Sequence, residues 1–113
     1  EQGNASALTS LGFHYAKGRG VDKDLDEARR LYRLSAEQGN WQAHRNLGYM
    51  YKEGKGVRID LVYALMWFIL ASSDGDEVAD SEVQDLSNQL DKSQVKEAYG
   101  LVADCLVNRF VGC

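Results

Sequence analysis

The fold is decided by a stretch that this chain contains twice, LGFHYAKGRGVDKDLDEA at residues 11–28 and LGYMYKEGKGVRIDLVYA at residues 47–64. The two copies agree at Leu-Gly, at the Tyr three residues after that Gly, at Gly-x-Gly-Val, at Asp-Leu and at the final Ala, always 36 residues apart. Identities that fall on glycine, aromatic and aspartate positions in one register are typical of a structural repeat. The sequence therefore predicts two copies of one supersecondary unit.

The second copy carries the signals of two helices. Asn40 is a favourable N-cap residue, and the apolar residues after it recur at helical spacing, which predicts a helix over about 41–53. Asp60 is a second favourable N-cap residue and predicts a helix that runs to about Ser73. The unit is therefore expected to be a helix, a turn and an antiparallel helix.

The first copy repeats this plan. Asp24 and Glu27 have the spacing of a capping box, which predicts a helix over about 25–37. Between the two helices of each copy we expect glycine in the left-handed backbone region, where other residues are disfavoured. The candidates for this conformation are Gly18, Gly20, Gly54 and Gly56.

Two further glycines fall inside predicted helices. Gly12 and Gly48 lie in the first helix of each copy, where glycine costs about 1 kcal/mol relative to alanine. Because both copies bear this cost, we expect the second helix to approach closely there, with Ala28 and Ala64 as small partners. Leu11/Leu47 and Tyr15/Tyr51, which both copies share, are expected to be structural.

The last third of the chain lacks a third copy. Its apolar spacing predicts one helix over about 77–90 and, after a cap formed by Asp91 and Gln94, another to about Phe110. The last residues of a solenoid must cover its final apolar face, so an atypical pair of helices is expected. The apolar positions of the final helix are Val95, Ala98, Tyr99, Val102, Leu106 and Phe110.

Composition excludes several classes of protein. The chain has 113 residues, a hydrophobic fraction of 44%, a charged fraction of 27% and no proline, which is typical of one soluble globular domain. Its net charge of −4 argues against a nucleic-acid partner, since binding to the phosphate backbone requires a basic surface. The longest apolar run, residues 61–71, is too short to span a membrane.

No motif predicts catalysis, a metal or a cofactor. The Gly-x-Gly pairs form neither a dinucleotide fingerprint nor a Walker loop. His14 and His44 have no ligand or triad partner at the required spacing, so both are expected to be surface or groove residues. The acidic cluster does not fit a calcium loop and is expected to be a solvated helix start. This cluster consists of Asp74, Asp76, Glu77, Asp80 and Glu82.

The tryptophans, Phe68 and a group of arginines are expected to have structural or solvated positions. Trp67 and Phe68 lie in the uninterrupted apolar helix and are expected in the core. Trp41, whose counterpart is Ala5, is expected to be partly exposed. Arg29, Arg30 and Arg33 form a stripe on one helix that is expected to be a solvated face, with an acidic partner as the alternative.

The pattern L-G-x-x-Y-x-x-G-x-G-V-x-x-D-L-x-x-A resembles the Sel-one-like repeat (SLR) family, a relative of tetratricopeptide repeats. The resemblance implies an all-α fold, a right-handed α/α superhelical solenoid in a single domain over 1–113. Its parts would be repeat one at 4–39, repeat two at 40–75 and a C-terminal capping helix pair at 76–113. The family often has Pro after Gly-Val, where this chain has Asp22 and Arg58.

Both ends of the chain bear on this resemblance. Ala64–Ala71 is similar to the segment that precedes two closing helices in bacterial members of the family. The initial Gly3-Asn4 matches the Gly-Asn that follows a repeat, so we expect this chain to be the C-terminal part of a longer array. The alternative is that the natural chain begins here.

The resemblance implies a non-enzymatic protein–protein interaction module, a scaffold or regulator that binds a protein or peptide and needs no cofactor. It also implies a bacterial protein, with a periplasmic or secreted location favoured over the cytoplasm. A cysteine-rich secreted branch of the family forms C-x7-C disulfides, but Cys105 and Cys113 lie out of register, so a disulfide and two free thiols both remain open. A glycan-binding envelope protein and, more remotely, a hydrolase are the alternatives.

Binding specificity is expected where the two copies differ on their first helix, which in this family presents the concave face. Such residues lie outside the shared framework and combine apolar anchors with polar groups, a composition typical of binding hot spots. The predicted binding residues are Ser10, Phe13, His14, Trp41, Arg45, Asn46, Tyr49 and Met50.

Overall fold

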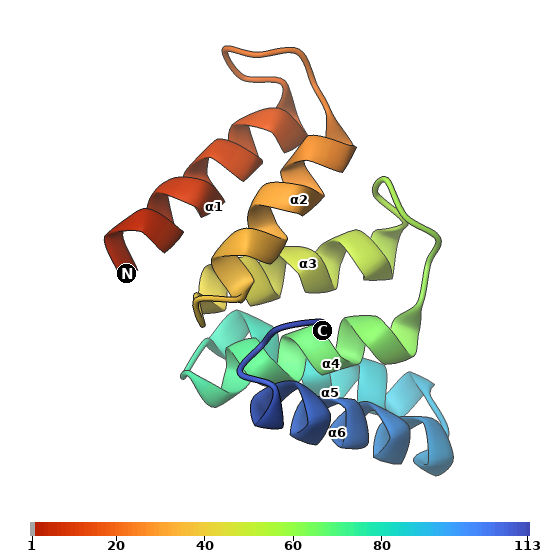
Figure 1. Cartoon of the computed structure of the whole chain (residues 1–113). Coiled ribbons are helices and arrows are strands. Elements are labelled where there is room, and N and C mark those ends of the chain that lie inside the picture. The colour runs from red at the N-terminus through yellow and green to blue at the C-terminus, as the bar shows by residue number, and fades with distance from the viewer. Residues whose placement is uncertain (1) are drawn as a thin grey trace.

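The structure is a computed structural model that describes residues 2–113, and the described residues are all-α (Figure 1). The helices are α1 Gln2–Lys17, α2 Leu25–Ala36, α3 Trp41–Glu53, α4 Leu61–Ser73, α5 Glu77–Gln89 and α6 Lys92–Val107. The α1 and α2 helices pack as one antiparallel pair and α3 and α4 as another, while α2 also lies against α3 and both α5 and α6 pack on α4. The predicted order of two helical repeats and a closing helix pair is confirmed.

The predicted caps begin the helices. The carboxylate of Asp24 accepts the Glu27 amide at 3.0 Å, and that of Asp60 accepts the Tyr63 amide at 3.0 Å. The Asn40 side chain accepts the Ala43 amide at 2.9 Å. The reciprocal bond of a capping box is absent at Glu27, because its carboxylate receives the Arg30 guanidinium at 2.6 Å instead.

Glycines end the first helix of each repeat as expected. Gly18 and Gly20 have φ angles of 69° and 78°, and Gly54 and Gly56 have φ angles of 72° and 75°. In this region an L-residue brings its Cβ too close to the backbone, which is why glycine is needed. The similar φ angles show that the turn after the first helix has the same backbone conformation in both repeats.

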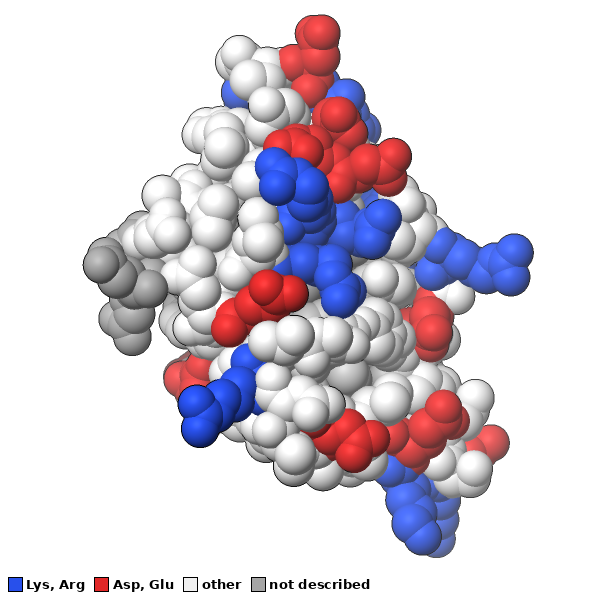
Figure 2. All heavy atoms as spheres, in the orientation of Figure 1, with Lys and Arg blue, Asp and Glu red and all other residues white. Residues whose placement is uncertain are grey.

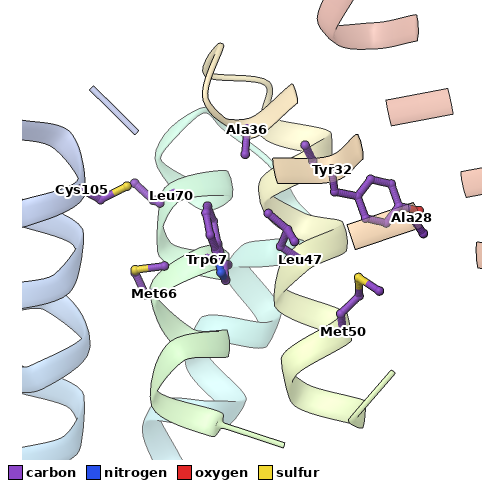
Figure 3. Close-up of a cluster of buried hydrophobic side chains, with 10 residues drawn as sticks. Ala28, Tyr32, Ala36, Leu47, Met50, Met66, Trp67, Leu70 and Cys105 are labelled. Atoms are coloured by element: carbon purple, nitrogen blue, oxygen red, sulfur yellow. The ribbon is translucent and has the colours of Figure 1, made fainter. Parts of the chain in front are cut away.

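Helix α4 is the centre of the molecule. It packs against α3 on one side and against α5 and α6 on the other, so its side chains are buried around the whole helix from Ala64 to Ala71. Trp67 and Phe68 lie in the core, as predicted. Figure 3 shows Trp67 and Leu47 between α3 and α4, with the Cys105 sulfur directed from α6 toward the same cluster.

The shared leucines differ in burial. Leu47 is 0% exposed because α2 packs on that face of α3, whereas Leu11 is 42% exposed. Among the described residues, no helix lies on α1 in the way that α2 lies on α3. The expectation that both leucines are structural is therefore correct for Leu47 and wrong for Leu11.

The end of α6 also differs from the prediction. The helix stops at Val107, because Arg109 and Phe110 adopt left-handed φ angles of 54° and 69°. The Phe110 amide donates to the Cys105 carbonyl at 2.8 Å, and a disulfide joins Cys105 to Cys113. Phe110 is thereby turned off the helix and back toward α2 and α3.

The buried face of α6 is narrower than its apolar pattern predicts. Ala98 and Cys105 are buried, while Tyr99 and Leu106, which the pattern placed in the core, are about half exposed. The helix presents only a narrow stripe to α4, so the two larger side chains lie beside the contact. Among the described helices, none is long and apolar enough to cross a membrane.

Candidate partner-binding groove

A groove lies between α1 and α3, with the start of α2 as its floor. Its larger hollow has a volume of about 400 Å³ and its smaller one about 250 Å³, and both are lined by Phe13 and Asn46. We call the two together the α1–α3 groove. The larger hollow is lined by Phe13, Ala16, Lys17, Lys23, Leu25, Tyr32, Asn46, Tyr49, Met50, Glu53 and Lys55. The smaller one is lined by Thr9, Ser10, Phe13, His14, Gln42, Arg45 and Asn46.

The repeat explains why a groove forms here. Ser10, Phe13 and His14 occupy on α1 the positions that Asn46, Tyr49 and Met50 occupy on α3. Positions three and four residues apart share one helix face. Because α2 packs against both helices, these two equivalent faces are held side by side with space between them.

A buried polar link fixes α1 relative to the start of α3. The Ser35 hydroxyl donates to the Ala5 carbonyl at 2.7 Å and lies 2.7 Å from the Thr9 hydroxyl. Thr9 in turn donates to the Asn40 side chain at 3.1 Å, the same group that caps α3. Buried hydroxyls that are bonded in this way make the spacing of the helices specific.

The structure places seven of the eight predicted residues on this groove. They are Ser10, Phe13, His14, Arg45, Asn46, Tyr49 and Met50. Trp41 is only partly buried, as expected, but it lies outside the lining, with the Arg45 guanidinium 5.3 Å from its ring centre.

Two of the seven are framework residues as well. Met50 is buried and packs in the main core cluster, so it forms part of the floor of the groove. The Tyr49 ring meets the Phe68 ring edge-on at 5.0 Å. The expectation that Tyr49 stands outside the repeat framework is therefore wrong, because the position carries an aromatic side chain long enough to reach α4.

Phe13 is the most exposed of the phenylalanine and tyrosine rings in the groove lining. It is 38% exposed, and the Lys17 ammonium and the Arg19 guanidinium lie 5.7 Å and 5.4 Å from its centre. Cations at this distance are attracted to the ring face. The groove thus offers an apolar surface bordered by positive charge.

The groove has a basic lining in a chain that is acidic overall. Lys17, Lys23, Lys55 and Arg45 line it, against a single carboxylate, Glu53. Arg45 is neutralised by Asp76 at 3.4 Å. Among the ion pairs found in residues 2–113, none includes one of the three lysines. The groove is therefore a locally positive surface on a chain whose net charge is −4.

Two residues of the acidic cluster, Asp76 and Glu82, form ion pairs with α3, the helix that forms one side of the groove. Asp76 caps α5 through the Val78 amide and also pairs with Arg45 on α3. Glu82 accepts a hydrogen bond from the Lys52 ammonium at 2.6 Å. Burial, with a smaller contribution from Glu82, raises the pKa of Tyr49 to about 12. These residues link α3 to α5, and the described part of the chain contains no His, Cys, Asp and Glu grouping suited to a metal.

His44 is expected from the sequence to be a surface or groove residue and is instead 1% exposed. Its ring stacks on Trp67 and lies 5.0 Å from Phe110, and its Nε2 lies 3.2 Å from the Ala36 carbonyl. Burial lowers the pKa of His44, although that carbonyl and Asp74 act in the opposite direction. Its repeat equivalent, Leu8, is aliphatic, and this was the signal that the position belongs to the interior.

The fold and the groove define a class of protein, an α/α repeat solenoid closed by an atypical helix pair. Residues 5–40 and 41–76 each match the Sel1 repeat. The chain therefore belongs to the Sel1 repeat family, the SLR family whose pattern it carries. The family consists mostly of adaptors, and no catalytic family is matched.

Solved structures agree with this assignment. One is a protective antigen of uropathogenic Escherichia coli strains that displays an SLR fold, with a TM-score of 0.85 and 29% identity over 94% of this chain. Another is a Sel1 repeat protein from Oxalobacter formigenes, with a TM-score of 0.73 and 33% identity over 93%. The chain spans 24% and 50% of those two proteins. No curated protein matches it.

Proposed function

We propose that this chain is a non-enzymatic interaction module that binds a segment of a partner protein in the α1–α3 groove. The observation that carries the proposal is the groove itself, formed by equivalent faces of the two first helices at positions where the repeats differ in sequence. Phe13 and Asn46 differ between the copies and lie outside the core clusters, so they are free to determine specificity.

The groove has the composition of a peptide site. Phe13 supplies an exposed ring, and Ala16, Leu25 and Met50 extend the apolar lining beneath it. Asn46 lies at the junction of the two hollows, where its amide can both donate to and accept from a peptide backbone. Apolar anchors with a few polar groups that fix orientation are typical of protein-binding surfaces.

The test uses peptides selected on the immobilised protein from a random library of about twelve residues. A selected peptide should bind Phe13→Ala/Asn46→Ala at least about tenfold more weakly than the unaltered chain, or about 1.4 kcal/mol. The matched control is Arg29→Ala/Arg33→Ala on α2, which lies outside the groove lining and should bind normally. Circular dichroism should show that both variants keep their helices.

The opposite pattern would overturn the proposal. If the groove variant bound at full strength while the α2 variant lost binding, the partner would occupy the other side of the solenoid. Tyr49 and Met50 are left intact in this design, because both also pack in the core and their loss would confuse binding with folding.

A further inference from the structure

We infer that the segment bound in the α1–α3 groove is acidic, with an apolar side chain packed on Phe13 and carboxylates facing Lys17, Lys23 and Lys55. The inference rests on the proposed function and specifies the chemistry of its partner. It is drawn from the charges on the groove and from the absence of counter-ions for them among the described residues.

The three lysines reach one end of the groove from three different elements. Lys17 ends α1, Lys23 precedes α2, and Lys55 lies in the turn after α3. Lys55 has a basic repeat equivalent, Arg19, which lies over Phe13, so each Gly-x-Gly turn places a cation at this end. A single acidic segment along the groove would therefore face cations contributed by both repeats.

Three other cations of the described residues form ion pairs, whereas the three lysines that line the larger hollow do not. Lys52 is bonded to Glu82, Arg45 to Asp76 and Arg30 to Glu27. The groove lysines have only Glu53 as a carboxylate in the same lining, and the repeat equivalent of Glu53 is Lys17 itself. Like charges held together in a hollow raise the local concentration of an anionic partner and its rate of association.

The apolar component comes from the same hollow. Phe13, Ala16 and Leu25 line the larger hollow together, so a leucine or aromatic side chain entering it would find apolar side chains to contact. The cations lie around this site, at 5.4 Å and 5.7 Å from the Phe13 ring centre. An acidic segment with an apolar anchor satisfies both features together.

The arginine stripe on α2 is the other basic surface, and it fits such a segment less well. Figure 2 shows its side chains gathered over α2 with acidic groups next to them. Asp26 and Glu37 line the same shallow hollow as Arg29 and Arg33, and no aromatic residue does. This surface therefore provides a matched control with the same sign of charge and without an aromatic anchor, since its one apolar lining residue is Leu34.

The experiment is peptide selection with a charge-reversed groove. From a random library of about twelve residues, the unaltered chain should enrich peptides that are net acidic and contain a large apolar residue. Lys17→Glu/Lys55→Glu should bind those peptides at least about tenfold more weakly and should itself enrich basic ones. Arg29→Glu/Arg33→Glu should enrich the same acidic peptides as the unaltered chain.

Salt provides an independent measurement. The dissociation constant of an enriched peptide should rise about fivefold or more between about 50 mM and about 300 mM NaCl, because added salt screens exposed charges. The lysine variant should lose most of this dependence. Circular dichroism of each variant checks that its helices are retained, because Lys17 and Lys55 are exposed but Arg29 and Arg33 are half-buried on α2.

The outcomes separate this inference from the proposed function. If peptides bind in a way that depends on Phe13 and Asn46 but are neutral or basic, the groove binds peptides and the acidic partner is wrong. If a single-stranded RNA of similar length binds the lysines more tightly than any enriched peptide, the inference is also overturned. If no peptide depends on Phe13 and Asn46, the proposed function fails as well.

Discussion

Gly48 of α3 lies directly against the ring of Phe68 on α4, so closely that a Cβ added to the glycine would be 2.8 Å from Phe68 Cε1. The same relationship occurs 36 residues earlier, where a Cβ on Gly12 would lie 2.7 Å from Tyr32 Cε1. Each repeat therefore has one helix crossing in which glycine makes room for an aromatic ring. Ala28 and Ala64, the partners expected from sequence, are fully buried, but the closest atoms belong to the rings.

Gly48→Ala should destabilise the protein by about 1–3 kcal/mol, because overpacking outweighs the gain of about 1 kcal/mol in helix propensity. Gly100→Ala is the matched control, since Gly100 lies within α6 and has no atom within 4 Å of an added Cβ. This second change should stabilise by about 0.5–1 kcal/mol. Urea unfolding measures both, and a Gly48→Ala variant as stable as Gly100→Ala would contradict the crossing.

Leu47→Ala and Leu11→Ala should differ in effect although the residues are repeat equivalents. Leu47 is enclosed by α2 and the core, so truncation should cost about 2–5 kcal/mol. Leu11 is exposed, and its truncation should change the free energy of unfolding by less than about 0.5 kcal/mol. Equal losses in thermal unfolding would show that another surface covers α1 in solution.

Stability should fall as the pH drops below about 6.5, the ordinary pKa of histidine. Burial lowers the pKa of His44 in the folded state, so below 6.5 the unfolded chain binds a proton that the folded chain does not. The loss approaches about 1.4 kcal/mol per pH unit and ends once the pH passes below the folded pKa. His44→Phe keeps the ring between Trp67 and Phe110 and should flatten this dependence in melting curves taken between about pH 7.5 and pH 5.

The disulfide between Cys105 and Cys113 should stabilise the fold by about 2–3 kcal/mol at most, because it closes a loop of only eight residues. It holds Phe110 against His44 and Gly39, at the junction of α2 and α3. Reduction should therefore lower the melting temperature of the unaltered chain and leave Cys113→Ser unchanged. Two reactive thiols in denatured, unreduced protein from its native source would contradict the pairing.

Most of the fold could be predicted from the sequence, because the repeat places capping residues and glycines where local backbone chemistry requires them. Asp24, Asn40, Asp60 and Asp91 all begin helices, and these signals act within three or four residues. Local chemistry of this kind is encoded in short stretches of chain and does not depend on distant packing.

The exceptions depend on contacts between distant segments. His44 is enclosed by Trp67 and by Phe110, which returns from the far end of the chain, and the Cys105–Cys113 disulfide in that returning segment lies outside the repeat. Leu11 is exposed because burial at that position is supplied by a neighbouring helix and not by its own sequence. In the groove, the spacing of three and four residues identified Ser10, Phe13, Asn46, Tyr49 and Met50, but not the lysines of the lining or the core contacts of Tyr49 and Met50.

The most direct test of the central claim is to map where a selected peptide binds, using changes in the backbone amide resonances of the isotopically labelled chain. The account predicts that the largest changes fall on both sides of the α1–α3 groove, at Phe13 and Lys17 on α1, at Asn46 on α3, and at Lys55 in the turn after α3. The resonances of Arg29 and Arg33 on α2 should change little. Changes confined to α2, or to the exposed face of α6, would contradict it.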